Sequence, residues 1–561
     1  MLRLSELKLP LDHSDDELAA AVIQRLRLRP DELRGHRVVK RSVDARRNQA
    51  IALVYSLDLE LAPAAEKRLL AGAKADPQLR HSPDEGYRFV LPPVDPADPI
   101  LRGGSLDRPV VVGAGPCGYF AALLLAQMGF RPLLLERGPC VKQRTADTFG
   151  FWKAQRPFNP ESNVQFGEGG AGTFSDGKLY SQVSEPRQYV RKVLEELVAA
   201  GANPEILSRH RPHIGTFKLA TVVRGLRARV LALGGEVRFG CRVEALELEA
   251  NSRRVRGVVL AGGEKITAAH VVLAIGHSAR DTFAQLHRQQ VDMQSKPFAI
   301  GLRIEHPQPL IDRARHGSAA GHPRLGAAEY KLVHHCRGPG LEGRDVYSFC
   351  MCPGGLVVGA ASEAGGVVTN GMSQHSRNER NANSALVVSV NQEDLHSFAE
   401  VPGDPLAGVA FQRHWERLAY ACGGGDFRAP VQSAADFLAG RIASDPERGA
   451  STEPSYQPGV VPGRLDTCLP AYVVEALREA LPAFAQRIPG FVGREAVLTG
   501  VETRTSSPVR MTRDAQTLQS TNTPGLFPGG EGAGYAGGIM SAAIDGIKLA
   551  EAVARRICSN S

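Results

Sequence analysis

Glycines at a fixed spacing are the first residues that suggest chemistry. The stretch "VVVGAGPCG" places Gly113, Gly115 and Gly118 in the pattern G-x-G-x-x-G, directly after a short β-branched apolar run. In this pattern the first glycine permits a tight turn, the second lets the backbone approach a pyrophosphate, and the third lets a helix pack against a strand. The helix N-terminus, here at Pro116, offers free N–H groups to phosphate. The spacing therefore predicts a dinucleotide-binding turn.

An acidic residue closes the next apolar run. Glu136 follows "FRPLLL" and is itself followed by Arg137. A carboxylate at this place can accept both hydroxyls of an adenosine ribose, and it repels a 2′-phosphate, which argues against NADP in this site. A lone glycine motif is weak evidence, but the order strand, glycine turn, helix, strand and acid makes this one specific.

The same stretch raises the question of a membrane span, because residues 109–130 contain no charge. A spanning helix needs about 20 residues that bond every backbone group internally. Here the glycines and Pro116 divide the run into a buried strand, a turn and a helix that ends at Gly129. The pattern therefore predicts a βαβ unit and no membrane span.

Later glycine-rich stretches supply further candidates for cofactor contact. Residues 166–179, "FGEGGAGTFSDGKL", are too rich in glycine for a helix or strand core, and they form either a flexible surface loop or, as we favour, a backbone that approaches a flat ring. The stretch "GLFPGGEGAGYAGGIMSAA" resembles the C-terminal element of flavoproteins, with Glu531 in place of the usual Asp. The resemblance implies that Glu531 could bond a ribityl hydroxyl and that the next helix points its N–H groups at the flavin. With the strand "VVLAIG" and its Gly276, these stretches give the remaining cofactor candidates: Gly169, Gly170, Thr173, Ser175, Val243, Ala274, Gly276, Gly530, Glu531, Gly538 and Ile539.

Residues for catalysis are less clearly marked. In "ETRTSSPVR", Arg504 and Ser507 could hold an anionic or carbonyl substrate, or Arg504 could form an ion pair inside a β domain, for example with Glu502. In "SFCMCPGG", Cys350 and Cys352 would share one face of a strand, which permits a redox pair. The alternative is that they are small buried apolar residues, since a C-x-C disulfide is strained.

The spacing of the histidines in the sequence does not indicate a metal site. His306 is expected to be structural, and His277 to lie beside the cofactor, with Ser278 capping the next helix. The neighbours His334 and His335 lack the spacing of metal ligands, so no metal is assigned.

These motifs need a particular arrangement of elements. Residues 1–100 read as a small α+β unit with a ferredoxin-like arrangement and a Pro-rich linker. Residues 101–290 and 495–561 form the two parts of a Rossmann-type FAD-binding domain, in which "EVRFGCRVEALELEA" reads as one strand. Residues 291–494, with many short strands, form a β-rich substrate or cap domain between them. The expected fold class is thus α/β.

The composition of the chain limits the partners and the cellular compartment that we expect. The chain has 561 residues, of which 43% are hydrophobic and 22% charged, and a net charge of +8 is mild for this length. We therefore do not expect nucleic-acid binding from charge alone. The N-terminus lacks a secretory pattern, and nine scattered cysteines without C-x-x-C pairs suggest free thiols in a reducing cytoplasm. The oligomeric state is left open.

The chain also resembles, over nearly its full length, a family of uncharacterised FAD-dependent dehydrogenases of bacteria and plastids. The stretches that carry the resemblance are "NVQFGEGGAGTFSDGKL", "RPHIGTFKL", "AIGHSARDTF", "KPFAIGLRIEHPQPLID", "YSFCMCPGG", "NGMSQHSRNERNANSALVVSV", "ETRTSSPVR" and "GEGAGYAGGIMSAAIDGIK". The resemblance implies FAD and an oxidoreductase, but no substrate.

Two classes of function follow. The first is an enzyme that passes a hydride through bound FAD to or from a small substrate. Because no second strand-glycine-helix unit is present, NAD(P)H would bind only transiently as a co-substrate. The second is a regulatory flavoprotein whose N-terminal domain binds a partner or RNA, and an RNA-modifying flavoprotein is a third reading.

Overall fold

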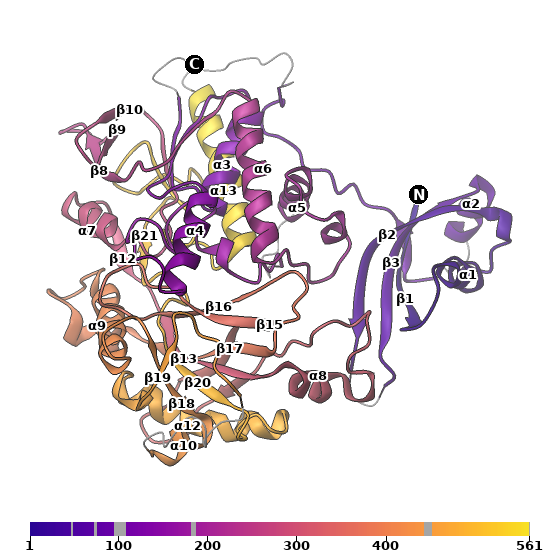
Figure 1. The fold of residues 1–561 in the computed structure, drawn as a ribbon. Coiled ribbons are helices and arrows are strands. Elements are labelled where there is room, and N and C mark those ends of the chain that lie inside the picture. Colours follow the sequence, from indigo (N-terminus) through magenta and orange to yellow (C-terminus); the bar gives the residue numbers. More distant parts are fainter. Residues whose placement is uncertain (47–48, 72–75, 95–107, 181–186, 442–451, 560–561) are drawn as a thin grey trace.

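The computed structural model describes residues 1–46, 49–71, 76–94, 108–180, 187–441 and 452–559. The described chain forms three parts, and Figure 1 shows the N-terminal one set to the side of the other two.

The N-terminal domain is a four-stranded antiparallel sheet with two helices. Its elements are β1 (Leu2–Pro10), α1 (Asp15–Leu26), η1 (Pro30–Glu32), β2 (Leu33–Asp44), β3 (Ala52–Leu61), α2 (Pro63–Ala71) and β4 (Leu79–His81). The strand order β2-β3-β1-β4 is the ferredoxin-like order, as predicted. Ser14 and Glu17 form a capping box that starts α1. Alternating leucines of β1 and β3 pack against α1, so this domain has its own core.

The second part is a five-stranded parallel sheet in the order β22-β11-β5-β6-β7. Its strands are β5 (Val110–Val112), β6 (Leu133–Leu135), β7 (Glu236–Arg238), β11 (Val271–Leu273) and β22 (Leu526–Pro528). Its main helices are α3 (Pro116–Gln127), α4 (Val141–Trp152), α5 (Tyr189–Ala199), α6 (Thr216–Ala232), α7 (Arg280–Arg288) and α13 (Ile539–Ser559), with short turns η2 (Ala171–Phe174) and η3 (Pro204–Leu207). This is the predicted Rossmann-type arrangement, in which the last strand and helix return from the far end of the chain.

One strand prediction in this part is wrong. Residues 236–250 do not form a single strand, because the chain leaves the parallel sheet after β7. It then enters a separate three-stranded antiparallel sheet of β8 (Val243–Leu248), β9 (Val255–Leu260) and β10 (Lys265–Thr267).

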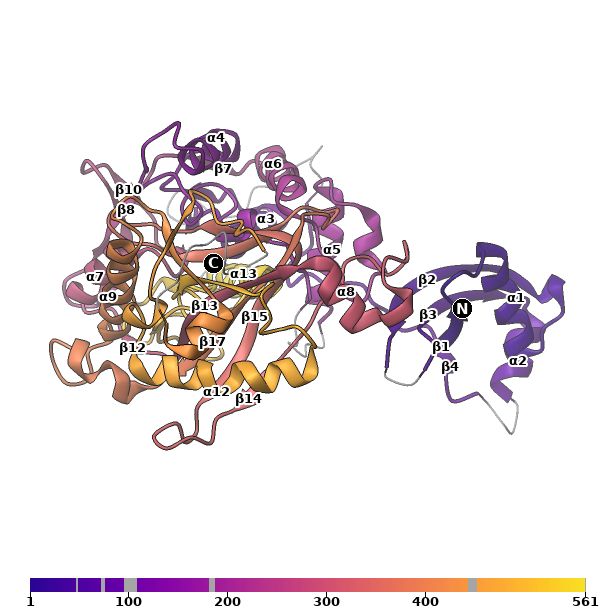
Figure 2. The same cartoon turned by 60° about the horizontal axis from the view of Figure 1, so that its bottom comes forward.

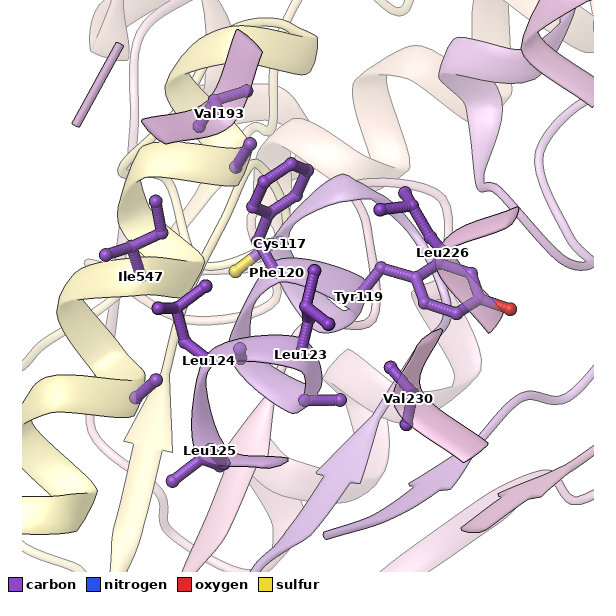
Figure 3. Close-up of a cluster of buried hydrophobic side chains, with 14 of the residues drawn as sticks. Cys117, Tyr119, Phe120, Leu123, Leu124, Leu125, Val193, Leu226, Val230 and Ile547 are labelled. Carbon is purple, nitrogen blue, oxygen red and sulfur yellow. The ribbon is translucent and has the colours of Figure 1, made fainter. Parts of the chain in front are cut away.

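The uncharged stretch lies at the centre of this domain. Helix α3 is apolar on every side because α13, α6 and α5 surround it, and Figure 3 shows Leu123 and Leu124 between Ile547 of α13 and Val230 of α6. In the part of the chain that the structure describes, no helix has the length and hydropathy to cross a membrane.

The third part is a β-rich cap. Its strands are β13 (Phe298–Pro307), β14 (Val333–His335), β15 (Asp345–Gly359), β16 (Thr369–Ser373), β17 (Asn381–Val390), β18 (Ala429–Ser433), β19 (Val460–Pro462) and β20 (Val497–Glu502). They follow the order β14-β15-β17-β13-β20-β18-β19, with β16 beside β15. Helices α8 (Gln308–His316), α9 (Ala407–Cys422), α10 (Ala434–Ala439) and α12 (Ala471–Arg487), with turns η4 (Gly317–Ala319), η5 (Gln392–Phe398) and η6 (Leu465–Thr467), complete it. Figure 2 shows α12 running along this sheet.

The cap differs from the prediction in two ways. Strands β13, β15 and β17 are long, whereas the sequence suggested only short ones. Strand β20 pairs with β13 and β18, so the cap sheet extends past the predicted boundary at residue 494. The two connections between cap and FAD domain pair with each other, through β12 (Met293–Ser295) and β21 (Val509–Met511).

Candidate active site

One large cavity joins the three parts of the molecule. Its volume is about 1730 Å³, and its walls include the turns after β5 and β11, the segment after β22, the inner face of β15 and residues of the N-terminal domain. Binding pockets for single ligands measure roughly 300–1,000 Å³. The cavity therefore has room for a dinucleotide and a second ligand.

The glycine turn forms one end of this cavity, and its glycines are needed for different reasons. Gly113 has φ 102°, and a Cβ there would lie 2.3 Å from the carbonyl oxygen of Ala274. A Cβ at Gly118 would lie 1.7 Å from the carbonyl oxygen of Gly113, so helix and strand touch here. At Gly115 the nearest atom would be 3.8 Å away, and this residue borders the cavity. Only Gly115 thus keeps open space, at a helix N-terminus without a side-chain cap.

Glu136 also borders the cavity and is 5% exposed. Its Oε1 accepts hydrogen bonds from the N–H groups of Gly138 (2.9 Å) and Gly167 (3.0 Å), and its Oε2 accepts one from Ala114 (2.8 Å). A carboxylate has about four acceptor positions. These contacts leave one acceptor position on Oε2 that faces no protein donor among the described residues.

Residues 166–179 are held in place by an arginine that the sequence did not indicate. Arg144 is fully buried, and its guanidinium donates to the carbonyl oxygens of Asn163, Val164, Glu168 and Gly170 at 2.7–2.9 Å. Burial lowers the pKa of Arg144 to about 10, so the group stays charged at neutral pH. This stretch is therefore an ordered wall of the cavity and not a flexible surface loop.

Some of the predicted residues of this wall border the cavity and others do not. Gly170 and Ser175 border the cavity, whereas Gly169 and Thr173 do not. A Cβ at Gly169 would meet the Thr173 hydroxyl at 2.2 Å, so these two residues pack on each other behind the wall. Gly118 packs helix against strand, the role that the glycine spacing suggested, and like Gly169 and Thr173 it does not border the cavity.

The segment after β22 forms the opposite wall. Gly530, Glu531, Gly538 and Ile539, which the sequence offered as cofactor contacts, all border the cavity. Asp545 of α13 holds the start of this segment by a hydrogen bond to its backbone, and the sequence did not single this residue out. Asp545 Oδ2 accepts the Gly530 N–H at 2.8 Å, and its carboxylate pairs with Arg513 at 2.7 Å.

Glu531 lies beside a histidine at the end of β11. Nδ1 of His277 lies 3.1 Å from Glu531 Oε1, and neither ring nitrogen of the buried His277 has a hydrogen bond among the described residues. Both side chains border the cavity. An unbonded buried imidazole facing open space suits a ligand with polar atoms. The remaining predicted contacts, Pro116, Arg137, Val243, Ala274 and Gly276, also border the cavity.

Arg504 borders the cavity, and its guanidinium is bonded to protein groups. It forms a bidentate ion pair with Glu416, at 3.0 Å for both bonds, and its Nη1 donates to the hydroxyls of Ser278 (2.7 Å) and Ser362 (2.6 Å). The ion-pair reading is thus correct, but Glu502 is not the partner, because it pairs with Arg303 at 2.8 Å. Ser278 accepts from Arg504 and does not cap α7, whose N-cap residue is Ala279.

Two other candidates for catalysis, Ser507 and Cys352, do not border the cavity. Ser507 is buried outside the cavity, and its hydroxyl donates to the carbonyl oxygens of Val509 (2.9 Å) and Gly532 (3.2 Å). Cys352 is fully buried and does not border the cavity, whereas Cys350 does. The difference arises because a bulge in β15, with φ 45° at Cys350, breaks the alternation that would place both thiols on one face.

Cys350 lies in a charged pocket. A hydrogen bond with Cys352 and the charges of Lys178 and Arg303 lower the pKa of the Cys350 thiol below its ordinary value. Lys178 contacts the Asp176 carboxylate and the carbonyl oxygen of Met351, and Asp176 also pairs with Arg377. All nine cysteines are free thiols. Cys350 is therefore a cavity-wall thiol whose thiolate form is favoured by the cations beside it.

The histidines away from the cavity have structural surroundings. His306 is fully buried with Nε2 2.8 Å from the carbonyl oxygen of Phe491, and burial lowers its pKa to about 4. The cap brings His334 together with Cys336 and Glu479, whose ligand atoms lie within 4.8 Å of one another. The sequence missed this cluster because Glu479 is distant in the chain. His334 Nε2 is hydrogen-bonded to Glu479 at 2.9 Å, and burial raises the pKa of Cys336 to about 11, which describes a hydrogen-bonded histidine–carboxylate pair beside a neutral thiol.

Known proteins resemble the chain in each part. Residues 107–293 match the family model "Pyridine nucleotide-disulphide oxidoreductase", residues 297–505 match "FAD-dependent protein, C-terminal domain-like", and residues 1–60 match a domain of unknown function. An uncharacterized protein of Clostridium beijerinckii is 44% identical over 553 residues, which are 98% of either chain.

Solved structures were compared in the same way. The chain is 12% identical to CtdE in complex with FAD (81% of this chain, 90% of the other, TM-score 0.31). It is 10% identical to glycine oxidase from Bacillus cereus (80% and 95%, TM-score 0.33), and 13% identical to E. coli quinol fumarate reductase FrdA (81% and 71%, TM-score 0.34).

Proposed function

Because the chain belongs to a family of FAD-dependent oxidoreductases, we propose that FAD lies along the described cavity and that a small substrate meets it under the cap sheet. The observation that carries this proposal is that one continuous cavity runs from the glycine turn at Gly115 to Cys350 on β15.

The cavity residues suggest how each portion of FAD would be held. The adenosine belongs beside Glu136 and Val243, and the pyrophosphate beside Gly115 and the N-terminus of α3. The flavin belongs between the wall at Gly170 and Ser175 and the segment of Glu531 and Gly538. The open space at Gly115 and the unbonded ring of His277 fit a bound polar group. Bound FAD supplies the two-electron acceptor and donor, which no side chain offers.

The protein's own residues have the tasks of binding, orientation and exclusion of water. The cap sheet closes the cavity on the side of Cys350, Asn370 and Lys178, and these side chains are candidates for contact with the substrate. Arg504 and Ser507 become positioning residues, since they fix the connection between cap and FAD domain. NAD(P)H is proposed as a transient co-substrate, because the described residues contain one strand-glycine-helix unit of this type.

We propose a cytoplasmic location, which the free thiols support. All nine cysteines are unpaired, and free thiols are typical of a reducing compartment. This supports the cytoplasm as the site of action.

The test is anaerobic mixing of the FAD-loaded protein with NADH, NADPH and panels of small carbonyl and alkene compounds. Bleaching of the flavin by a reductant, and its return with one panel member, is the expected result. A protein that neither contains nor takes up FAD would refute the proposal.

A further inference from the structure

Six exposed cations that line the cavity have no acidic partner among the described residues. This cationic mouth consists of Lys40 on β2, Arg80 on β4, Arg211, Arg315 on α8, Lys331 and Arg487 at the end of α12. All six side chains are exposed, and none forms an ion pair within the described ranges of the chain. Deeper cavity cations differ, since Lys178 and Arg504 are paired with Asp176 and Glu416.

Acidic groups at this end do not neutralise the mouth. Glu85 and Glu329 are already paired, with Arg3 and Arg377. Glu6 is the carboxylate that has no such pair among the described residues at this end. His210 reports the excess of positive charge, because burial and then the charges of Lys40 and Arg211 lower its pKa. The potential at the mouth is therefore positive.

The arrangement of these cations indicates an extended ligand. They come from the N-terminal domain, the FAD domain and the cap, so one carboxylate could contact only a few of them. Arginine and lysine are the usual partners of phosphate groups. Tyr180 borders the same region, is 42% exposed and carries the Arg211 guanidinium 5.6 Å from its ring centroid. An exposed aromatic ring beside cations offers a stacking surface for a base.

We propose that the cationic mouth binds the phosphate groups of a nucleotide-type handle, whose attached substrate reaches into the cavity toward Cys350. This inference rests on the proposed function, since it names the class of substrate for the same cavity. It assigns the N-terminal domain a direct part in substrate binding, through Lys40 and Arg80.

The test is titration of the FAD-loaded full chain with inorganic pyrophosphate, ADP and coenzyme A, followed by calorimetry. We expect all three to bind, with affinity falling as salt is added, because exposed charges are screened. Arg315→Glu should weaken binding by roughly tenfold or more, the effect of losing one charge-assisted hydrogen bond. Arg313→Glu is the matched control, since Arg313 is exposed on the same helix but does not border the cavity.

A second pair of variants checks the N-terminal domain. Lys40→Glu should weaken binding as Arg315→Glu does, whereas Arg34→Glu on the same strand should not, because Arg34 lies outside the cavity lining. Tyr180→Ala should weaken ADP and coenzyme A but spare pyrophosphate. Equal weakening of all three would leave a site for phosphate groups without a base.

Several outcomes would overturn the inference. They are an FAD-loaded protein that ignores all three probes, variants that bind as tightly as the wild type, and tight binding of single-stranded RNA without binding of the small probes. FAD content measured on each sample separates these outcomes from failure of the proposed function, which would appear as loss of FAD.

Discussion

Arg504 and Glu416 form a bidentate, buried ion pair between the segment after β20 and helix α9, with both N–O distances at 3.0 Å. Arg280 of α7 shares the same carboxylate at 2.8 Å, so α7 of the FAD domain and α9 of the cap meet at Glu416. The pair therefore holds the two domains together on one side of the cavity.

Replacing Arg504 should lower the stability of the fold, because its main contacts are with protein groups. We expect Arg504→Ala to lower the free energy of unfolding by about 3–5 kcal/mol, because it leaves part of a buried charge without its partner. Arg413→Ala, which breaks the partly exposed pair with Glu363, should cost about 1 kcal/mol or less. Urea unfolding of both variants provides the comparison. Unchanged stability with lost turnover in Arg504→Ala would return this residue to a role in substrate binding.

Substitutions at two glycines of the same turn should have different effects, one on FAD binding and the other on folding. Gly115→Val should fold but lack FAD, since its side chain enters the open space of the cavity while no atom blocks it within 3.8 Å. Gly118→Ala should fail to fold, because its Cβ would lie 1.7 Å from the Gly113 carbonyl oxygen. The measurements are flavin absorbance per protein and circular dichroism. Full FAD occupancy in Gly115→Val would contradict the assigned site.

The reactivity of Cys350, which lies on the cap side of the cavity, tests whether FAD covers that side. The pKa of Cys422 is lowered to about 6 by a hydrogen bond with Cys468, and the pKa of Cys350 is lowered by Cys352 and the charges of Lys178 and Arg303. Both thiols should therefore react with iodoacetamide at a lower pH than an ordinary cysteine does. Cys422 does not border the cavity and serves as the internal reference. Mass spectrometry should show that bound FAD slows alkylation at Cys350 relative to Cys422, and equal rates with and without FAD would exclude Cys350 from the flavin side.

The sequence could predict what is local and missed what is distant. The turn from Gly113 to Gly118 and the acid at Glu136 lie within one βαβ unit, so spacing alone predicts their neighbours. The partners of Arg504, Gly530 and His334 are Glu416, Asp545 and Glu479, and no local pattern marks these acids. The bulge at Cys350 has the same cause, because register in β15 depends on its partner strand and not on its own residues. Hence the cofactor side of the cavity was predictable, whereas the cap side required the structure.

The boundary of the N-terminal domain can be tested by two truncations that differ in one short segment. The domain has its own core, and residues 87–94 pack outside it, against the core of the FAD domain. In that segment the Tyr87 hydroxyl donates to Glu551 of α13 at 2.7 Å. A chain starting at residue 83 should therefore remain soluble and bind FAD, although it loses the mouth residues Lys40 and Arg80.

A chain starting at residue 95 should be less stable than the one starting at residue 83. It uncovers the apolar side chains that Tyr87 and Phe89 protect, and it deprives the buried Glu551 of one of its hydrogen bonds. We expect a loss of about 1–3 kcal/mol from that hydrogen bond alone. Thermal unfolding of the two chains, each with its FAD content, provides the measurement. Loss of FAD already in the chain starting at residue 83 would mean that the N-terminal domain helps to form the cofactor site itself.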